Sequence, residues 1–429
     1  MQTKAYPELD EQLFSETLES GLRVRVVPKR GFCTNYAALA VNYGGAHRRF
    51  RLDGETVETP AGVAHYLEHK AFDLPDGDNA LALLSANGAD PNAFTAAGVT
   101  CYYFQCAENF EENLRLLLHF VTTPYFTEET VEKERGIIAQ EIRMRQDQPG
   151  RRVRTELLKA LYEHHPIREG NLGTEEDIAR VTPELLTLCH EAFYRPDDMI
   201  LCCAGDVDPE AVFALASRLL PEKPRRKMPE RDRCGEEGLT PVRVRTETEM
   251  SVSMPVFLLG SKLTFAPEGK DWQRRLLLAD LSCALFLGES SPLYASLYEE
   301  GRINRSFSCG VTDFPGGAVC TAGGRCADPQ AVLGRIVDAA ESFRTDRETA
   351  ERFRRLQKAA RGNFIMALDS LSGLCHTQAD GHFMGFDGME APAVLDGLAP
   401  EEAAAFIRET FRADRLALSV VRPTESGKG

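Results

Sequence analysis

Short apolar runs bounded by glycine, proline or charged residues recur along the chain and predict strands. LRVRVVPK at 22–29 and YAALAVNYGG at 36–45 come before a first helical pattern, and SVSMPVFLLGSK at 251–262 comes before a second, DWQRRLLLADLSCALFLGE at 271–289. The order of predicted elements is therefore similar in the two halves of the chain.

The first helix is predicted over residues 61–72. Thr59 can serve as its N-cap and Pro60 as its first-turn proline, and apolar residues follow at roughly helical spacing. A second helix is predicted in FTEETVEKERGIIAQEIRMRQDQPG, where Thr127 can cap a helix that stops before Pro149. Glu128 and Glu129 open this helix, and we assign them to its dipole rather than to a site.

The repeated order predicts an α+β protein made of two homologous sheet-plus-helix domains of about equal size. The stretch 220–241 is rich in proline and charge and lacks apolar periodicity, so it is predicted to be a linker. We therefore predict an N-terminal domain at 1–219 and a C-terminal domain at 242–429.

Composition indicates a globular protein, with 43% hydrophobic and 27% charged residues among 429. The net charge of -15 argues against nucleic acid or an anionic membrane as a partner. The first residues are polar and no apolar run is long enough to span a bilayer, so we expect a cytoplasmic protein. The twelve cysteines form no C-x-x-C pair, which favours reduced core thiols over disulfides.

The strongest chemical signal is HYLEHKAFD, at residues 65–73. On a helix His65 and His69 share a face and can reach one cation, and Glu68 beside them is placed for general-base work. A catalytic zinc takes three protein ligands and keeps one position for water. The pattern therefore predicts a third ligand elsewhere in the chain.

The best candidate for that ligand lies on the second predicted helix. Glu134 and Glu141 are two turns apart and share a face, and Glu141 follows two isoleucines, where a buried carboxylate would need a cation. We assign Glu141 as the third metal ligand and Glu134 to the catalytic site as support for a ligand. The alternative is that a lone histidine or an acidic helix residue is structural.

The remaining histidines carry weaker signals. His164 and His165 are adjacent, so their side chains point apart, and we expect a loop or surface pair rather than ligands. His376 and His382 lie in GLCHTQADGHFMGFDG, whose glycines predict a mobile loop.

His65, Glu68 and His69 match the inverted zincin motif. Glu134 with Glu141 resembles the downstream ligand helix of the insulinase and pitrilysin metallopeptidases, which include the mitochondrial processing peptidases. The resemblance to the bacterial YmfH-like subgroup covers most of the N-terminal half. It is carried by GVAHYLEHKAFD, NGADPNAFTAAGVTCYYF, PYFTEETVEKERGIIAQEI and YRPDDMILCCAGDVDP.

The resemblance implies a zinc endopeptidase in which Glu68 deprotonates a water held by the metal, and the metal polarises the peptide carbonyl. It also implies that the substrate adds as a strand to a sheet edge, for which the matching segment is PNAFTAAGVTCYYFQC at 91–106. Asn92 and Ala93 match positions beside the scissile bond, although Asn92 alone is equally typical of a turn.

The second half lacks the metal residues, because its helix at 271–288 has no histidine and RETAERFRRLQKAARGNFIMALDS is basic. One zinc per chain is therefore expected. Complete members of the family carry an arginine and a tyrosine, seven residues apart, that contact the substrate carbonyl. The matching positions here hold Tyr298 and Arg305 in reversed order, with Arg302 nearby.

A displaced pair of Tyr298 and a nearby arginine is one interpretation of this departure. The resemblance to the YmfH-like subgroup implies instead a division of labour, in which the chain is the catalytic half of a clam-shaped assembly. The expected partner is a paralogue that lacks the motif and supplies the arginine and tyrosine, with a homodimer as the alternative. Two other functions stay open. One is a scaffold subunit, and the other is a peptide-binding subunit or regulator with little turnover.

Overall fold

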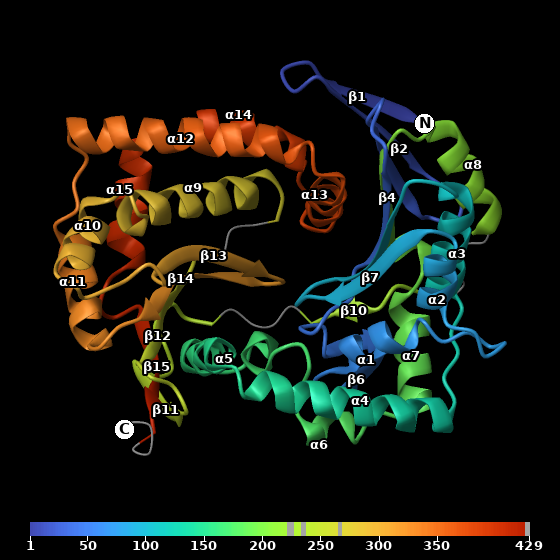
Figure 1. Ribbon diagram of the computed structural model, residues 1–429, viewed down its shortest axis with the longest axis horizontal. Coiled ribbons are helices and arrows are strands. Elements are labelled where there is room, and N and C mark those ends of the chain that lie inside the picture. The colour runs from blue at the N-terminus through green and yellow to red at the C-terminus, as the bar shows by residue number, and fades with distance from the viewer. Residues whose placement is uncertain (221–226, 233–236, 265–267, 425–429) are drawn as a thin grey trace. The chain divides into compact units, whose positions relative to one another are not determined.

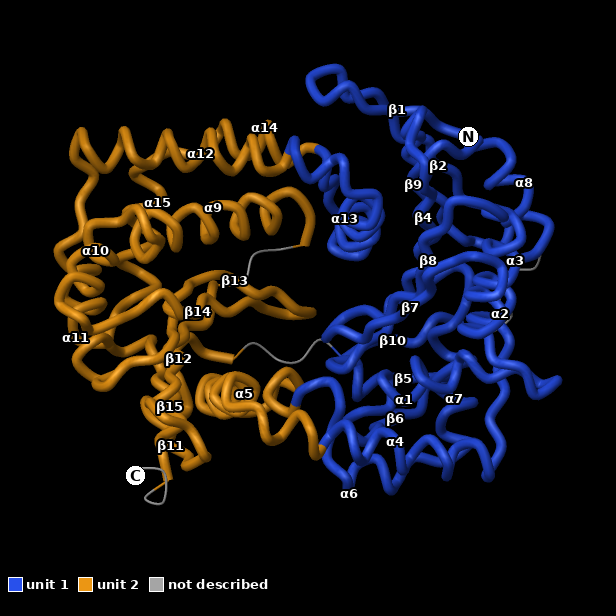
Figure 2. Tube along the Cα trace, in the orientation of Figure 1, with its two compact units in different colours: residues 1–142, 170–232, 365–389 blue, residues 143–169, 233–364, 390–429 orange. Residues whose placement is uncertain are grey.

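A computed structural model describes residues 1–220, 227–232, 237–264 and 268–424 (Figure 1). It contains two compact units, which Figure 2 colours separately. Unit 1 comprises residues 1–142, 170–232 and 365–389, and unit 2 comprises residues 143–169, 233–364 and 390–429. Each unit combines a sheet with helices, so the α+β class is confirmed. Unlike the predicted contiguous domains, each unit also takes one segment from the other half of the sequence.

Unit 1 is built on a seven-stranded sheet whose edge strands are β1 and β7. β3 and β9 pair in parallel, and all other neighbours are antiparallel. The central strands β4 and β9 are almost wholly buried, which explains their continuous apolar sequences. In spatial order the strands are β1 (Gln2–Tyr6), β2 (Glu11–Thr17), β3 (Arg23–Pro28), β9 (Met199–Gly205), β4 (Asn35–Val41), β8 (Thr100–Cys106) and β7 (Ala89–Thr95).

All the helices of unit 1 except the last share one hydrophobic core with this sheet. Leu67 and Leu117 on two of the helices and Leu201 on β9 are buried in it. The helices are α1 (Val63–Lys70), α2 (Ala80–Ala86), α3 (Phe110–Thr122), α4 (Glu128–Gln146), α6 (Glu175–Ile178), α7 (Pro183–Phe193), α8 (Pro209–Leu219) and α13 (Leu371–Phe383). The last turn of α4 belongs to unit 2. A small sheet of β10 (Glu230–Arg231), β5 (Arg49–Leu52) and β6 (Glu55–Glu58) completes the unit.

The mobile loop predicted around His376 and His382 is wrong, because both residues lie on α13. The side chain of Ser370 caps this helix by accepting a hydrogen bond from the Gly373 amide. A stripe of buried residues then packs α13 against β4 and β9, and Arg25 of β3 donates to both the backbone and the side-chain oxygen of Gln378 at 2.9 Å. This burial outweighs the cost of about 1 kcal/mol for each glycine in a helix.

Unit 2 has a five-stranded sheet, which includes the strand predicted at 251–262. In spatial order its strands are β11 (Arg245–Met250), β15 (Leu416–Pro423), β12 (Val256–Lys262), β14 (Gly317–Arg325) and β13 (Ser308–Phe314). Its helices are α5 (Pro149–Leu161), α9 (Lys270–Leu287), α10 (Pro292–Glu299), α11 (Pro329–Glu341), α12 (Arg347–Ala367, which ends in unit 1), α14 (Ala391–Asp396) and α15 (Pro400–Thr410). α5 packs on β12 and β15, and a side chain at Gly260 would press on Leu157 and Leu161 of that helix.

Three 3₁₀ turns join these elements: η1 (Pro166–Glu169), η2 (Pro196–Asp198) and η3 (Gly388–Glu390). The described cysteines are free thiols, and all except Cys33 and Cys309 are buried. Among the described residues no single helix is long and apolar enough to cross a membrane, while α9 and α10, bent by 40°, meet that test only as a pair.

The predicted linker at 220–241 falls partly outside the described residues, at 221–226 and 233–236. Between these gaps Glu230 and Arg231 form β10, which pairs with β5. Arg231 donates to the Asn42 carbonyl and to the Asp198 carboxylate, and its guanidinium lies 5.1 Å from the centre of the Phe193 ring. The middle of the predicted linker is therefore anchored in unit 1.

We expect Arg231→Ala to lower the free energy of unfolding by about 3–5 kcal/mol, because it leaves the Asp198 carboxylate buried without its cation. Burial already raises the pKa of Asp198 above its usual range, and Arg231 opposes that rise. A raised carboxyl pKa favours the folded state at low pH and disfavours it as pH rises. The deficit relative to the native chain should therefore shrink as pH falls, as denaturant unfolding at several pH values would measure.

Arg49→Ala is the matched control. Arg49 lies 3.5 Å from Asp232, and both side chains are exposed, at 62% and 43%. Its removal should change stability by less than about 1 kcal/mol. A similar loss in both variants would contradict the assigned role of Arg231.

Candidate metal centre

The helix predicted at 61–72 is present as α1, but its predicted cap is wrong. α1 begins at Val63 after Gly62, whose φ is 92°, and the Thr59 hydroxyl instead donates to the Arg48 carbonyl at 3.2 Å. A side chain at Gly62 would also clash with the Leu172 carbonyl. Glycine is therefore required for both the left-handed backbone and the close packing that set the start of α1.

α1 and α4 bring His65, His69 and Glu141 together. His65 Nε2 and His69 Nε2 lie 3.6 and 3.7 Å from Glu141 Oε2. A tetrahedral zinc with bonds of about 2.0–2.2 Å would separate its ligand atoms by roughly 3.4 Å. Among the described residues, this is the only group of three or more His, Cys, Asp or Glu side chains whose ligand atoms all lie within 4.8 Å. Two imidazoles and one carboxylate with this spacing fit a zinc ion.

Glu134 orients one of the two imidazoles. His69 Nδ1 donates to Glu134 Oε1 at 2.8 Å, which leaves the lone pair of Nε2 for the metal position. Burial disfavours the charged imidazolium, but the bond to Glu134 and the negative charges of Glu134, Glu68 and Glu141 outweigh it and raise the pKa of His69. The site therefore attracts positive charge.

The local sequence explains why α4 lies where it does. The Thr127 hydroxyl accepts a hydrogen bond from the Thr130 amide at 3.2 Å, as predicted for the N-cap. Val131, Ile138 and Ile142 form the buried face of α4. The Tyr66 hydroxyl of α1 donates to the Val131 carbonyl, so the two helices that carry the ligands are joined directly.

Glu68 is buried beside the candidate metal ligands, with 8% of its surface exposed. Thr95 Oγ1 donates to Glu68 Oε2 at 2.6 Å. Sequence reasoning missed Thr95, and the nearest signal was its place within the segment predicted as the sheet edge, 91–106. Asn171, whose amide donates to the Thr95 carbonyl at 3.1 Å, was also missed.

Asn92 and Ala93 lie on β7, an edge strand of the unit 1 sheet. The Ala93 amide donates to Asn92 Oδ1 at 2.8 Å, and Asn92 is exposed. Only the first part of the segment predicted as the edge, 91–106, fits that description. Residues 100–106 form β8, which is flanked by β4 and β7.

Tyr298 and Arg305 belong to unit 2 and are not part of the metal-ligand group. Tyr298, 44% exposed, stacks on Tyr294 within α10, and Arg305 is exposed between α10 and β13. Arg302 Nε donates to Glu300 at 2.7 Å.

His164 and His165 are also residues of unit 2 outside the metal-ligand group. His164 is exposed, while His165 is buried and its Nε2 donates to the Pro315 carbonyl at 2.9 Å. These partners give His165 a structural role.

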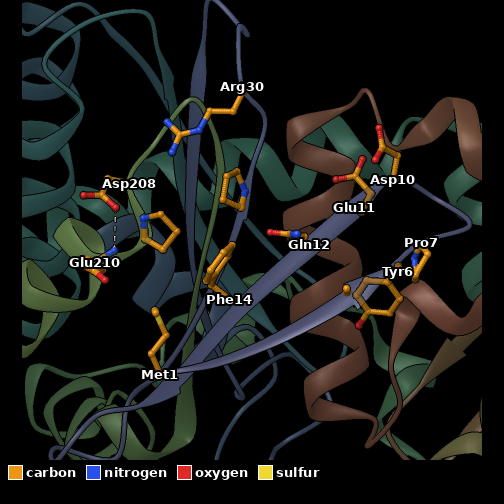
Figure 3. Close-up of a pocket in the computed structure, with 13 residues that line it drawn as sticks. Met1, Tyr6, Pro7, Asp10, Glu11, Gln12, Phe14, Arg30, Asp208 and Glu210 are labelled. Atoms are coloured by element: carbon orange, nitrogen blue, oxygen red, sulfur yellow. Dashed lines mark hydrogen bonds between the residues drawn. The ribbon is translucent and has the colours of Figure 1, made fainter.

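A separate pocket of about 610 Å³ lies on β1 and β2 (Figure 3). Asp10, Glu11, Arg30 and Asp208 contribute charge to its lining, and the Asp208 carboxylate accepts a hydrogen bond from the Glu210 amide at the start of α8. Its lining includes none of the metal ligands or Glu68. The pocket and the candidate metal centre are therefore different places on unit 1.

Comparison with known proteins gives family matches in both halves of the chain. Residues 54–175 match the family profile described as Insulinase (Peptidase family M16), and residues 180–360 match the profile described as Peptidase M16 inactive domain. The Bacillus subtilis (strain 168) protein named uncharacterized zinc protease YmfH is 36% identical over 97% of this chain and 98% of its own length. The matched region of the first profile includes every candidate ligand.

Solved structures show the same fold. An M16-like peptidase from Alicyclobacillus acidocaldarius is 32% identical, with a TM-score of 0.91 over 99% of this chain and all of its own. The periplasmic protease PqqL from Escherichia coli is 17% identical, with a TM-score of 0.71, and the match covers 96% of this chain but 47% of PqqL. Because both profiles match and the identity to YmfH extends over nearly the whole of both proteins, the chain belongs to the insulinase family of peptidases, M16.

Proposed function

We propose that the chain is a zinc-dependent endopeptidase that hydrolyses peptides or small unfolded polypeptides. The observation that carries this proposal is the convergence of His65, His69 and Glu141 on one point, with the buried carboxylate of Glu68 on the same helix turn. The zinc-protease names of its relatives support it.

The two Nε2 atoms and Glu141 would hold the zinc. When bound, a zinc ion supplies a water of lowered pKa and polarises the carbonyl that is attacked. Glu68 accepts the proton of the attacking water and afterwards delivers a proton to the leaving amine. Its burial keeps solvent from competing for this proton, and Glu134 keeps His69 in the tautomer that presents Nε2.

The edge of β7 is the proposed peptide-binding strand. The Ala96 amide donates to the Val99 carbonyl at the hairpin turn, so along β7 the backbone groups of Thr95, Ala93 and Pro91 face away from β8. The Thr95 carbonyl already accepts a hydrogen bond from the Asn171 side chain, and Pro91 has no amide hydrogen to donate to a peptide. A peptide strand would therefore pair mainly with Ala93, after its amide leaves the side chain of Asn92.

We further propose that this chain is the catalytic subunit of a two-subunit enzyme. The reversed order of Tyr298 and Arg305, and their exposure on unit 2, support a carbonyl-binding pair supplied by another chain. The match to about half of the length of PqqL is consistent with an assembly of two such chains. A peptide-binding or scaffold subunit with little turnover is the alternative, favoured by the same reversed pair.

Glu68→Gln should retain stoichiometric zinc and lose cleavage of a mixed peptide pool by about 10²–10⁴-fold, because the amide cannot accept the proton. His65→Ala and Glu141→Ala should instead lose the zinc. Metal analysis and mass spectrometry of the peptide products measure both effects. Full activity of Glu68→Gln would sink the assignment of the base.

Glu134→Gln should weaken zinc binding by about 10–100-fold at neutral pH, because it replaces the charged acceptor that orients His69 by a neutral and weaker one. Because the pKa of His69 is raised in the native chain, protons begin to compete with zinc for this imidazole at a higher pH than they would for an ordinary histidine. The zinc affinity of the native chain therefore starts to fall at that higher pH. Without Glu134 this fall should begin at lower pH. Competition with a chelator across pH measures it, and exposed Glu129→Gln on the same helix should match the native chain.

Purified zinc-loaded chain should cleave the peptide pool strongly only after its motif-lacking paralogue from the same genome is added. In that mixture Tyr298→Phe and Arg305→Ala should leave the rate unchanged, because the partner supplies these groups. Strong cleavage by the chain alone that both variants abolish would refute the shared site. Absence of cleavage in every combination would favour the peptide-binding alternative.

A further inference from the structure

Thr95 connects the edge strand β7 to the candidate base, Glu68. It is the last residue of β7, and its hydroxyl lies 2.6 Å from Glu68 Oε2 and 3.4 Å from the hydroxyl of Thr100, its partner across the hairpin. Thr100 Oγ1 donates to the Tyr43 carbonyl at 2.8 Å. Because each hydroxyl has a single proton, that of Thr100 goes to Tyr43 and that of Thr95 goes to Glu68.

The backbone of Thr95 is fixed as well. The side-chain amide of Asn171 donates to its carbonyl at 3.1 Å. The turn that follows is held by the Gly45 amide, which donates to the Ala96 carbonyl at 3.0 Å. A side chain at Gly45 would clash with Asn171, and one at Gly44 with the Ala96 carbonyl. The glycine pair thus allows the close approach that locks Thr95 in place.

Such a fixed hydroxyl matters because the last torsion of a glutamate side chain is broad and has no steep preference of its own. A short hydrogen bond from a neutral donor to a carboxylate is charge-assisted, and it is strongest where water is excluded. Glu68, 8% exposed, is in such a place. The bond therefore selects one orientation of the carboxylate plane relative to α1.

We propose that Thr95 is a positioning residue for Glu68, and that Asn171 acts through Thr95 by holding its backbone. The hydroxyl fixes the carboxylate in the orientation from which it takes the proton of the attacking water. Thr95 is also the last residue of β7, the proposed peptide-binding strand. Peptide binding and the placement of the base therefore depend on the same residue. This inference rests on the proposed role of Glu68.

Thr95→Val removes the hydroxyl but keeps the branched shape that suits a strand. We expect kcat to fall by about 10–100-fold, with KM, zinc content and melting temperature close to those of the native enzyme. Thr95→Ser should restore most of kcat, because it restores the donor. Thr3→Val, on exposed Thr3 of β1 in the same sheet, should leave kcat unchanged.

A second measurement needs neither zinc nor turnover. In metal-free protein, infrared difference spectra of Thr95→Val against the native chain should show a shift in one carboxylate stretching band. The same substitution made in Glu68→Gln should show no such band, because the carboxylate that changes is Glu68. Thr95→Ser should largely remove the shift.

The two measurements separate failure of the inference from failure of the proposed function. A Glu68-dependent shift together with the selective loss of kcat supports the positioning role. A native kcat in Thr95→Val, or the absence of a Glu68-dependent shift, would overturn it. If no combination of chains cleaves any peptide, the endopeptidase proposal fails, while the infrared result still decides whether Thr95 holds Glu68.

Discussion

The contact between α1 and α4 is the constraint on which the candidate site depends. It places the carboxylates of Glu68, Glu134 and Glu141 around two imidazoles, with only 16–18% of the Glu134 and Glu141 side chains exposed. Three carboxylates gathered in a partly buried site raise the energy of the folded state unless a cation balances their charge. The raised pKa of His69 reflects the same preference for positive charge, which a divalent ion would satisfy more fully. Metal binding and the local stability of the two helices are therefore expected to be coupled.

The features that sequence reasoning found depend on short-range geometry. The spacing of His65 and His69, the shared face of Glu134 and Glu141, and the Thr127 cap all follow from helical periodicity. The features it missed depend on residues distant in sequence. Gly62, packed on Leu172, is the N-cap of α1, so Thr59 does not cap the helix and its hydroxyl donates to Arg48. α13 forms despite its glycines because the unit 1 sheet buries one of its faces. Thr95 contacts Glu68, and Asn171 contacts Thr95, only where segments distant in sequence come together in the folded unit.

The two halves of the chain share an architecture but not a chemistry. Both units pair a sheet with helices, and the profile matched by the second half is itself described as an inactive domain. The candidate metal ligands all lie on unit 1, while Tyr298 and Arg305 lie exposed on unit 2. Because of this asymmetry, the metal motif of unit 1 does not by itself determine which groups bind the substrate carbonyl.

The exchange of segments between the halves has a consequence for synthesis. Unit 1 contains residues 365–389, and α13 from that segment packs on its central strands. A ribosome adding about 5–20 residues per second would release the metal ligands many seconds before α13 exists. From the synthesis of β9 until α13 emerges, the apolar face of β4 and β9 lacks its cover, and we expect a nascent chain of this fold to offer that face to chaperones.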